Sequence, residues 1–563
     1  MNHSNIFMKK RFVFYVLLFA FSIHSVHSQS LLDDENPVDL NAWKNASWRE
    51  VSDLSIAPIS KKAEVKSGKG AILADGNASM VFPEVNQSYI LSFDCKMEPQ
   101  SIAHLALTNE NKLSLAISEF GSILTNGIEN RPDVNAARAL GLWQNVEISV
   151  DKSKNLPGFI TVNFVKVNNL IVLQHIILPA KDLEKNHLKF EVSNGKFALK
   201  NLKILEQSDI KPITLTDLKG EIWEDFDWDK ISTEGRKSMA KAEINALNYD
   251  IGQGLSRKNF IAKYDGVLNV DKAGIYNFML DISGKFMLTI DNELIFPFDE
   301  SFSDRQRFSK KVNLKEGKHD FHLEYLKVWM RPALGLSVSG NGAKSYALND
   351  LTSLPEIKNY GNIKLNPKVQ TEVIRGFYMH NGVKNTTALA AGFTSKLNYA
   401  IDIEKGSLMT IWKGNFTDMT EMWHERGEPQ TFKADGMYVN FSGKDILLDQ
   451  NNKPVSINYL GQEMDSDNSP IFEYQTEQGL GLTEQILPMN AGFNVMFNFK
   501  NTSNTNLVLG RSKEIVKVEK GVYKVGDCYI QINEKLKAQI VQIDDESVLL
   551  VPATNSVSYN LIW

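Results

Sequence analysis

The chain has 563 residues, a formal net charge of −5, 43% hydrophobic residues and 23% charged residues. This apolar content is sufficient for sizeable cores and excludes a disordered chain, and the length allows about three or four domains. The mildly acidic balance, without a dense basic patch, argues against nucleic acid as a partner. The two cysteines are too few for a disulfide-rich scaffold, an iron–sulfur protein or a cysteine-based zinc ribbon.

The N-terminal residues have the pattern of a targeting segment. Residues 9–11 are all basic, and residues 12–23 form an apolar run that is too short to span a bilayer comfortably. We therefore expect a cleaved signal peptide over residues 1–28, a mature chain that begins at Gln29, and a secreted or periplasmic protein. An uncleaved anchor is the alternative. No later stretch reaches membrane-spanning length, so we expect no transmembrane segment in the mature chain.

Short runs of alternating apolar and polar residues recur along the whole chain and predict an all-β fold. Their spacing, with Gly, Asn, Asp and Pro clusters between them, is typical of tandem sandwiches or barrels. Composition changes near 207–212 and 351–367 divide the mature chain into three domains, 29–208, 209–352 and 353–563. The strongest runs lie at 88–97, 144–151, 159–167, 187–192, 276–282, 286–291, 319–326, 456–461 and 493–499.

Other signals are sparse. The best helical candidate covers residues 238–247, and the chain has no glycine-rich phosphate loop after a strand and no G-x-S-x-G nucleophile elbow. Cys95 and Cys528 lie in strand-like runs of different predicted domains. We expect them to be small buried hydrophobic residues, although a disulfide is the alternative for an exported protein.

The first domain begins with a Leu-x-x-Trp element that ends at Trp43, continues with a strand around Trp143, and closes with a strand that contains Asn201. In this order it resembles the 3-keto-disaccharide hydrolase family, a jelly-roll of the concanavalin/laminin-G type. The family's Asn-Ser-Gly and Glu-x-Gln strands, which line its concave face, are absent from the corresponding HLALTNENKLSLAISEFGSIL segment. The resemblance therefore implies a jelly-roll that has lost the family's chemistry.

The polar residues in that segment and just after it are His104, Thr108, Asn109, Glu119 and Glu129. A glycosidase needs two facing carboxylates, so Glu119 and Glu129 are the candidate catalytic pair. The alternative is that both are solvated loop acids.

The second domain contains a series of aromatic, glycine and acidic residues at specific spacing: Phe260, Tyr264, Gly266, Gly274, Tyr276, Phe278, Asp291, Asn292, Gly317, His319, Glu324 and Tyr325. In this series it resembles the protective-antigen-type domain, a β-barrel found in bacterial toxins, glycosidases and adhesins. The resemblance covers essentially the whole domain.

Sugar-binding members of that family hold calcium with an Asp-Asp pair, because calcium requires several hard oxygen ligands. Here Ile282 and Ser283 occupy the matching positions. The resemblance therefore implies no cofactor; calcium is possible but not favoured, and we expect no metal site. Asp281 and Asp291 are candidate ligand-binding residues, although Asp291 with Asn292 also has the pattern of a hairpin turn.

The third domain carries a W-x-G-x-F-x-D…W…R-G pattern that begins at Trp412. It resembles an uncharacterised β-sandwich module of exported bacterial proteins, which often accompanies sugar-dehydrogenase-like and cytochrome domains. Trp412, Phe416 and Trp423 are candidates for a wall that stacks on sugar rings, with Asp418 and Arg426 as polar edges. The alternative is a buried aromatic core closed by an Arg–Asp pair.

The residues leave three functions open. The first is an exported, non-catalytic protein that recognises carbohydrate. The second is an enzyme that cleaves 3-keto-glycosides or related glycosides through the first domain. The third is an assembly partner of an exported oxidoreductase, with the third domain as its docking module. Two carboxylates that converge in the first domain would favour catalysis, and an exposed apolar patch on the third would favour docking.

Overall fold

The structure is a computed structural model that describes residues 37–39, 47–82, 85, 87–152, 156–181, 188–224, 232–251, 259–297, 306–327, 331–354, 362–424, 430–490, 492–500 and 504–563. The expected signal peptide lies outside these residues. Apart from one short helix, α1 (Thr420–His424), and a few 3-10 turns, their regular elements are strands. The predicted all-β fold with several sheets is therefore confirmed. Within the described ranges, no helix is long and apolar enough to cross a membrane.

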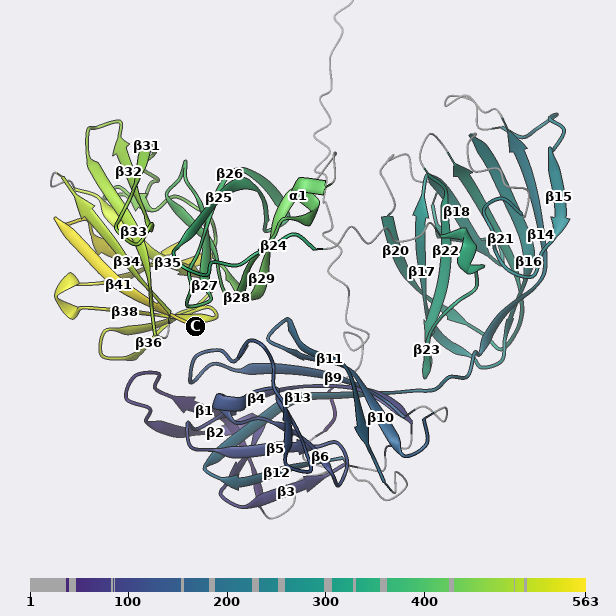
Figure 1. Ribbon diagram of the computed structural model, residues 1–563, viewed down its shortest axis with the longest axis horizontal. Helices are drawn as coiled ribbons and strands as arrows, with labels where there is room; N and C mark the ends of the chain where they lie inside the picture. Colours follow the sequence, from purple (N-terminus) through teal and green to yellow (C-terminus); the bar gives the residue numbers. More distant parts are fainter. Residues whose placement is uncertain are drawn as a thin grey trace, which may run out of the picture.

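The first unit, residues 48–207, is a sandwich of two antiparallel sheets, drawn in purple to blue in Figure 1. Aromatic side chains fill the space between them, with the rings of Phe93 and Phe190 in edge contact at 4.9 Å. One sheet has the order β1 (Trp48–Ile56), β2 (Ala63–Asp75), β13 (Lys196–Gln207), β4 (Ser88–Met97), β9 (Gln144–Asp151), β10 (Phe159–Val167) and β11 (Leu170–Pro179). The other has the order β3 (Ala78–Val81), β12 (Lys189–Asn194), β5 (Ile102–Ala106), β6 (Asn111–Ser114), β7 (Ile123–Thr125) and β8 (Ile128–Asn130).

The second unit, residues 213–347, has two sheets that enclose a core of their own. Alternation places Tyr276, Phe278 and Leu280 of one strand in this core. The larger sheet has the order β15 (Ala240–Glu243), β14 (Ile213–Glu224), β16 (Phe260–Val270), β21 (Gly317–Lys327), β18 (Lys285–Ile290) and β19 (Glu293–Phe296). The smaller has the order β20 (Gln306–Leu314), β17 (Gly274–Ser283), β22 (Ala333–Gly340) and β23 (Ala343–Ala347).

The helix predicted over residues 238–247 is wrong. This segment contains β15, which pairs with β14 at the edge of the larger sheet. Ala240, Ala242 and Ile244, spaced two residues apart, pack against the core, whereas Lys241 and Glu243 are exposed. The period of two and the open edge of β14 outweigh the helical propensity of the alanines.

The third unit, residues 364–562, contains three sheets. The first has the order β24 (Lys364–Leu365), β28 (Ser407–Asp418), β27 (Leu397–Asp402), β26 (Val383–Gly392), β25 (Glu372–His380) and β29 (Thr431–Asn440). The second has the order β30 (Leu447–Leu448), β35 (Asn506–Ser512), β40 (Glu546–Pro552) and β39 (Gln539–Ile543). The third has the order β31 (Ile457–Met464), β32 (Pro470–Thr476), β33 (Gly481–Met489), β34 (Gly492–Phe499), β41 (Ser556–Ile562), β38 (Cys528–Ile532), β37 (Val522–Val525) and β36 (Ile515–Glu519).

The strongest alternating runs of the sequence all correspond to strands. Cys95 and Cys528 are both buried and both free, as expected for small hydrophobic residues. They lie in different units, on β4 and β38, so each fills a place in its own sheet and they form no disulfide.

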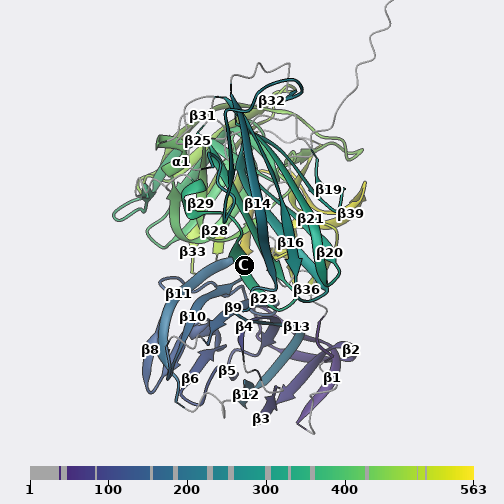
Figure 2. The ribbon, with the colours of Figure 1, turned by 90° about the vertical axis from the view of Figure 1, so that its right-hand side faces the viewer.

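The first and third units are in contact, and in Figure 2 the third unit lies above the first, behind the second. Their buried apolar residues form one continuous cluster. At the boundary, Leu142 packs against Val522, Tyr529 and Ile562. Both guanidinium Nη atoms of Arg138 contact the Asp527 carboxylate, at 3.2 and 3.1 Å.

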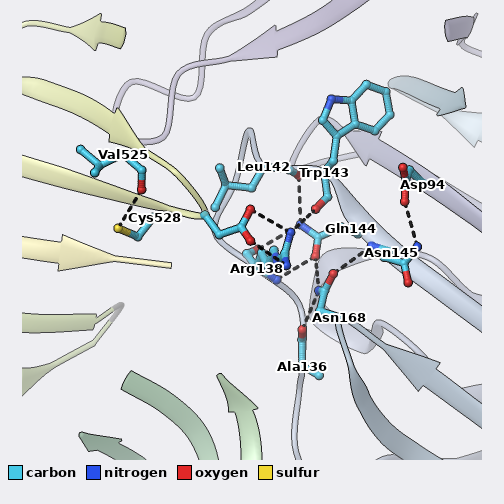
Figure 3. A network of polar contacts seen from close by, with 11 residues as sticks. Asp94, Ala136, Arg138, Leu142, Trp143, Gln144, Asn145, Asn168, Val525 and Cys528 are labelled. Atoms are coloured by element: carbon cyan, nitrogen blue, oxygen red, sulfur yellow. Dashed lines mark hydrogen bonds and ion pairs between the residues drawn. The ribbon is translucent and has the colours of Figure 1, made fainter. Parts of the chain in front are cut away.

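A network of amide side chains holds the loop that carries Arg138 (Figure 3). Gln144 accepts a hydrogen bond from the Arg138 backbone N–H at 2.7 Å and donates to the carbonyls of Arg138 and Leu142. Asn168 donates to Gln144 and to the Ala136 carbonyl, both at 2.8 Å. The residues around Trp143 and Asn168 therefore position the contact with the third unit.

The second unit meets the first through a narrower contact. Ser208 forms a bridge with Ala343, and its N–H donates to the Gly342 carbonyl at 2.8 Å. Lys344 makes ion pairs with Asp151 at 3.1 Å and with Asp209 at 2.8 Å. In Figure 1 the second unit, in teal, and the third unit, in green to yellow, rise on opposite sides above the first.

Candidate functional site

A two-residue hairpin at the edge of the first unit positions Glu129. Asn126 and Gly127 connect β7 to β8 with φ values of 48° and 84°. Two successive positive φ values are characteristic of a type I′ turn, which Asn-Gly favours. The hairpin pairs Glu129 with Leu124 and so brings the acid back over the edge of the sheet.

A 3-10 turn, η2 (Ile117–Glu119), positions Glu119 beside this hairpin. The chain leaves the turn through Gly121, which has a φ of 87°, and a Cβ atom there would lie 3.2 Å from the side chains of Val167 and Val172. Glycine is therefore required for this path. The Asn135 side chain donates to the Ile117 carbonyl at 2.9 Å and ties the segment after β8 to the turn.

These elements enclose a pocket of about 300 Å³. Glu119 and Glu129, the two carboxylates singled out from the sequence, both line it. The volume is at the lower end of the range for small-molecule sites. The complete lining consists of Ser118, Glu119, Phe120, Ser122, Glu129, Arg131, Pro132 and Asn135.

Arg131 is the cation of this pocket and pairs with Glu129. Its Nε donates to Oε2 of Glu129 at 2.5 Å, while the arginine side chain remains 71% exposed. The hydrogen bond from this guanidinium to Glu129, together with the charges of Glu129 and Glu119, raises the pKa of Arg131. The second oxygen of Glu129, Oε1, is covered and has no hydrogen-bond partner. One carboxylate is thus held by a cation, and the other lies beside the pair.

The other polar candidates of this segment lie elsewhere. Thr108 accepts hydrogen bonds from the backbone N–H groups of Glu110 and Asn111, so it builds the turn between β5 and β6, where Asn109 also lies. His104 lies on β5, opposite Glu191. Partial burial and the charge of Lys112 lower the pKa of His104, against the opposing charges of Glu191 and Glu119.

In the third unit, Trp412 and Phe416 do not form a ligand wall. Both side chains have 0% exposure, and their rings stack on each other with centroids 6.2 Å apart. The indole Nε1–H donates to the carbonyls of Asn415 and Phe416, at 2.9 and 2.8 Å. Gly392 leaves room for the Phe416 ring, which would lie 2.4 Å from a Cβ atom there. These two aromatics are core residues, so the predicted sugar-stacking role is wrong for both.

Trp423 differs from them because it lies on α1 and is 54% exposed. Asp418 accepts a hydrogen bond from the Thr420 N–H at 2.9 Å, just before this helix. Partial burial raises the pKa of Asp418, but the hydrogen bonds with Thr420 and the charges of Lys364 and Lys433 lower it overall. Arg426 lies outside the described residues. The three predicted aromatics therefore divide between the core and the surface.

The two aspartates that were predicted to bind a ligand in the second unit, Asp281 and Asp291, have different surroundings. Asp281 is buried on β17 and accepts a hydrogen bond from Arg307 Nε at 3.0 Å. Asp291 and Asn292 have φ values of 52° and 63° and form the turn between β18 and β19. The Asp291 carboxylate contacts His319 Nδ1 at 2.6 Å and accepts the Asp320 N–H at 2.8 Å. The turn interpretation of Asp291 is thus confirmed, and the two acids belong to different sheets of the unit.

The positions that match the family's calcium pair do not fit calcium. Ile282 is a buried core residue, and the Ser283 hydroxyl donates to the Arg331 carbonyl at 2.5 Å. Ile282 has no side-chain oxygen, and a single hydroxyl does not replace the pair of carboxylates that holds calcium. In the part of the chain that the structure describes, no group of three or more His, Cys, Asp and Glu side chains is placed to hold a metal ion.

Sequence reasoning missed the remaining lining residues of the first-unit pocket, among them Arg131 and Asn135. Both follow the Asn126–Gly127 turn within ten residues, and that dipeptide is a strong hairpin signal. It could have placed the segment from Glu129 to Asn135 against the preceding turn.

No protein-family model matches the chain, and no curated protein matches it. Solved structures with local similarity include a β-glucosidase from Kluyveromyces marxianus, with 14% identity over 22% of this chain and 17% of that chain and a TM-score of 0.19. The PA14 domain of the MpAFP antifreeze protein has 12% identity over 26% of this chain and 92% of that domain, with a TM-score of 0.21. A GH31 α-xylosidase from Xanthomonas citri has 9% identity over 54% of this chain and 32% of that chain, with a TM-score of 0.22.

The matched segment thus spans about a sixth of the length of the β-glucosidase. At these identities and TM-scores, the similarities assign neither a family nor an activity to this chain.

Proposed function

We propose that the protein is an exported carbohydrate-recognition protein that binds a sugar in the first-unit pocket without cleaving it. The observation that carries this proposal is the convergence of Glu119, Glu129 and Arg131 on one pocket of about 300 Å³. The Glu119 carboxylate can accept hydrogen bonds from sugar hydroxyls, and the Arg131 guanidinium, which Glu129 holds in place, can donate to them, so the set suits a ligand rich in hydroxyl groups. The resemblance of the first two units to sugar-associated families points to the same ligand class.

The geometry of Glu129 supports binding rather than hydrolysis. A glycosidase delivers a proton to the glycosidic oxygen from one carboxylic acid while a second carboxylate acts on the opposite side. Oε2 of Glu129 accepts the Arg131 Nε–H, and Oε1 is covered. Neither oxygen of Glu129 is therefore free to act on a bound glycoside, which leaves Glu119 without the second carboxylate that hydrolysis requires.

The experiment is a glycan array with the mature protein, with and without calcium, followed by calorimetric titration of the best glycan. Glu119→Gln and Glu129→Gln should each weaken binding at least about tenfold, which corresponds to about 1.4 kcal/mol. Glu64→Gln is the matched control, because Glu64 is exposed on β2 and does not line the pocket. Equal affinity in all four proteins would show that the sugar binds elsewhere or not at all.

The glycoside-cleaving alternative is favoured by one observation, the presence of two carboxylates in the same pocket. Incubation of the wild-type protein with the bound glycan distinguishes the two functions. Release of a reducing sugar that Glu119→Gln abolishes while the glycan still binds would replace the proposal with an enzyme.

A further inference from the structure

His319, near the start of β21 in the second unit, has an acceptor at both ring nitrogens. Its Nδ1 lies 2.6 Å from Oδ2 of Asp291, and its Nε2 lies 2.8 Å from the Lys315 carbonyl oxygen. Asp291 belongs to the turn between β18 and β19, whereas Lys315 lies between β20 and β21. The imidazole, which is only 11% exposed, therefore joins two separate turns of the unit.

His322, three residues further along the same strand, has the same arrangement on the outer face of the larger sheet. Its Nδ1 lies 2.7 Å from Oδ1 of Asp265, which is directly opposite on β16. Its Nε2 lies 3.3 Å from Oε1 of Glu324, which also makes an ion pair with Lys263 of β16 at 2.8 Å. The ring therefore links the two central strands of this sheet through their side chains.

Only the imidazolium form satisfies both nitrogens of either ring. A neutral imidazole has one N–H, and its other nitrogen is an acceptor, so that nitrogen would face an oxygen that has no proton to donate. The imidazolium donates from both nitrogens, and its hydrogen bonds to carboxylates are charge-assisted and therefore strong. Both arrangements thus fit a positively charged histidine.

The carboxylates at these rings remain ionised. Partial burial raises the pKa of Asp291, but the hydrogen bonds from His319 and from the Asp320 N–H lower it overall. The hydrogen bond from His322, against partial desolvation, lowers the pKa of Glu324 to about 2. Both acids therefore stay acceptors across the pH range in which histidine titrates, and the histidines are the groups that change.

The other strands packed against the rings add no charge. β16 presents Leu268 opposite His319, and β18 presents Thr289 opposite His322. Three carboxylates and one ammonium group lie around His322 on its face of the sheet, and this balance favours the imidazolium. These side chains are Lys263, Asp265, Asp320 and Glu324.

Both histidines consequently hold a proton more tightly than a free histidine does. Partial burial lowers the pKa of His319, but the hydrogen bonds with its two partners raise it overall above the usual value of 6.5. The hydrogen bond with Glu324, against partial burial and with the help of the Asp265 carboxylate, raises the pKa of His322. A histidine whose folded pKa exceeds its unfolded value stabilises the fold below the unfolded value, near 6.5, and loses that contribution as the pH rises through the folded pKa.

We propose that His319 and His322 form a pH-sensitive lock in the second unit, closed when both rings carry two protons and released as the medium becomes alkaline. In the closed form, the His319 imidazolium holds the β18–β19 turn against the turn before β21, and the His322 imidazolium holds β16 against β21. Loss of a proton leaves one nitrogen facing an oxygen with no hydrogen between them, so that contact is lost. The lock is separate from the first-unit pocket and does not depend on sugar binding.

The test is differential scanning calorimetry of the whole mature protein from pH 6 to 9. We expect the wild-type transition of the second unit to fall by at least about 2 °C over this range. His319→Gln and His322→Gln should each lower this transition at pH 6 and reduce its fall toward pH 9. His104→Gln is the matched control: partial burial lowers the pKa of this first-unit histidine, so its removal should leave the fall unchanged.

His322→Lys separates the charge from the shape of the ring. Lysine stays positively charged over the whole range, so this variant should melt near the wild type at pH 6 and fall less toward pH 9. In the wild type, NMR titration of the histidine ring C–H groups should show at least two midpoints above 6.5, and each variant that folds identifies its own resonance. The proposal is overturned if both Gln variants keep the wild-type fall, or if both rings titrate at or below 6.5.

Discussion

The second unit and the pair formed by the first and third units are built on the same kind of antiparallel strands but attached in different ways. The first and third units share one continuous cluster of buried apolar residues, although residues 209–352 separate them in sequence. The second unit encloses its own core and meets the first through Lys344 and a short backbone bridge. Order along the chain therefore does not determine which units stabilise one another.

The two modes of attachment differ in the chemistry of the contact surfaces. Leu142 and Ala139 of the first unit pack against residues of β37, β38 and β41 in the third unit, so the third unit covers apolar side chains of the first. The contact of the second unit is mainly polar and solvated, and such contacts contribute little to stability. We therefore expect the first and third units to unfold together and the second unit to unfold by itself.

The largest expected effect is that of Trp412→Ala. Removal of this fully buried ring should destabilise the third unit by about 3–5 kcal/mol. In differential scanning calorimetry, the joint transition of the first and third units should move to lower temperature while the transition of the second unit stays in place. Trp423→Ala is the matched control. Its ring is 54% exposed, so its effect should stay within about 0.5 kcal/mol.

A second unit that shifts together with Trp412→Ala would contradict the proposed independence. A large loss of stability in Trp423→Ala would show instead that α1 packs against the core more closely than its exposure indicates.

Leu142→Ala tests the boundary itself. Leu142 is 3% exposed between the first and third units, so truncation should cost about 2–4 kcal/mol. The joint calorimetric transition should broaden or divide into two, because the substitution removes contacts between units rather than within one. Leu460→Ala, at a position that is 59% exposed on β31, is the control and should leave the transition unchanged. A uniform shift without separation would mean that the two units remain coupled through Arg138 and Asp527.

The alternation of apolar and polar residues made most of the strands predictable. It also indicated that Trp412 and Phe416 lie on the same face of a strand. Residues four apart in a strand lie on the same face, and one face of each sheet packs on a core. The side chains of Trp412 and Phe416 point into that core. Trp423 lies outside this core because the strand ends at Asp418 and the chain continues into α1. The aromatic residues looked like one cluster only because they are close in sequence.

The pockets were harder to predict because they depend on contacts between distant or irregular segments. Glu119 and Glu129 were identified as candidates, but their convergence depends on the positive φ values of Gly121, Asn126 and Gly127. Glu484, a buried acid on β33 that lines a cavity in the third unit, occupies an inward position of an alternating strand, a signal that was present in the sequence. The space beside it depends on six segments of the third unit, and no local pattern contains that information.

The smallest expected effect is a difference in pH dependence between the second and third units. In the second unit, the hydrogen bond from His322, against partial desolvation and with the help of Lys263, lowers the pKa of Glu324 to about 2. A carboxyl whose folded pKa lies below its unfolded value stabilises the fold above the unfolded value, near 4.5, and loses that contribution as the pH falls toward 2. For Glu484, burial raises the folded pKa, so its favourable contribution is present below about 4.5 and is lost as the pH rises.

Because the two folded pKa values shift in opposite directions, Glu→Gln substitutions at these two positions should change the melting temperature in opposite directions. At pH 7, Glu324→Gln should lower the melting temperature of the second unit by the equivalent of about 1 kcal/mol, and the difference should shrink as the pH falls below 4. Glu484→Gln should raise the melting temperature of the joint first–third transition at pH 7 to 8, and that difference should disappear below about pH 4.5. Calorimetric scans from pH 3 to 8 measure both. If the two variants changed with pH in the same direction, Glu484 would be ionised in the folded protein and held by a charge that the fold itself supplies.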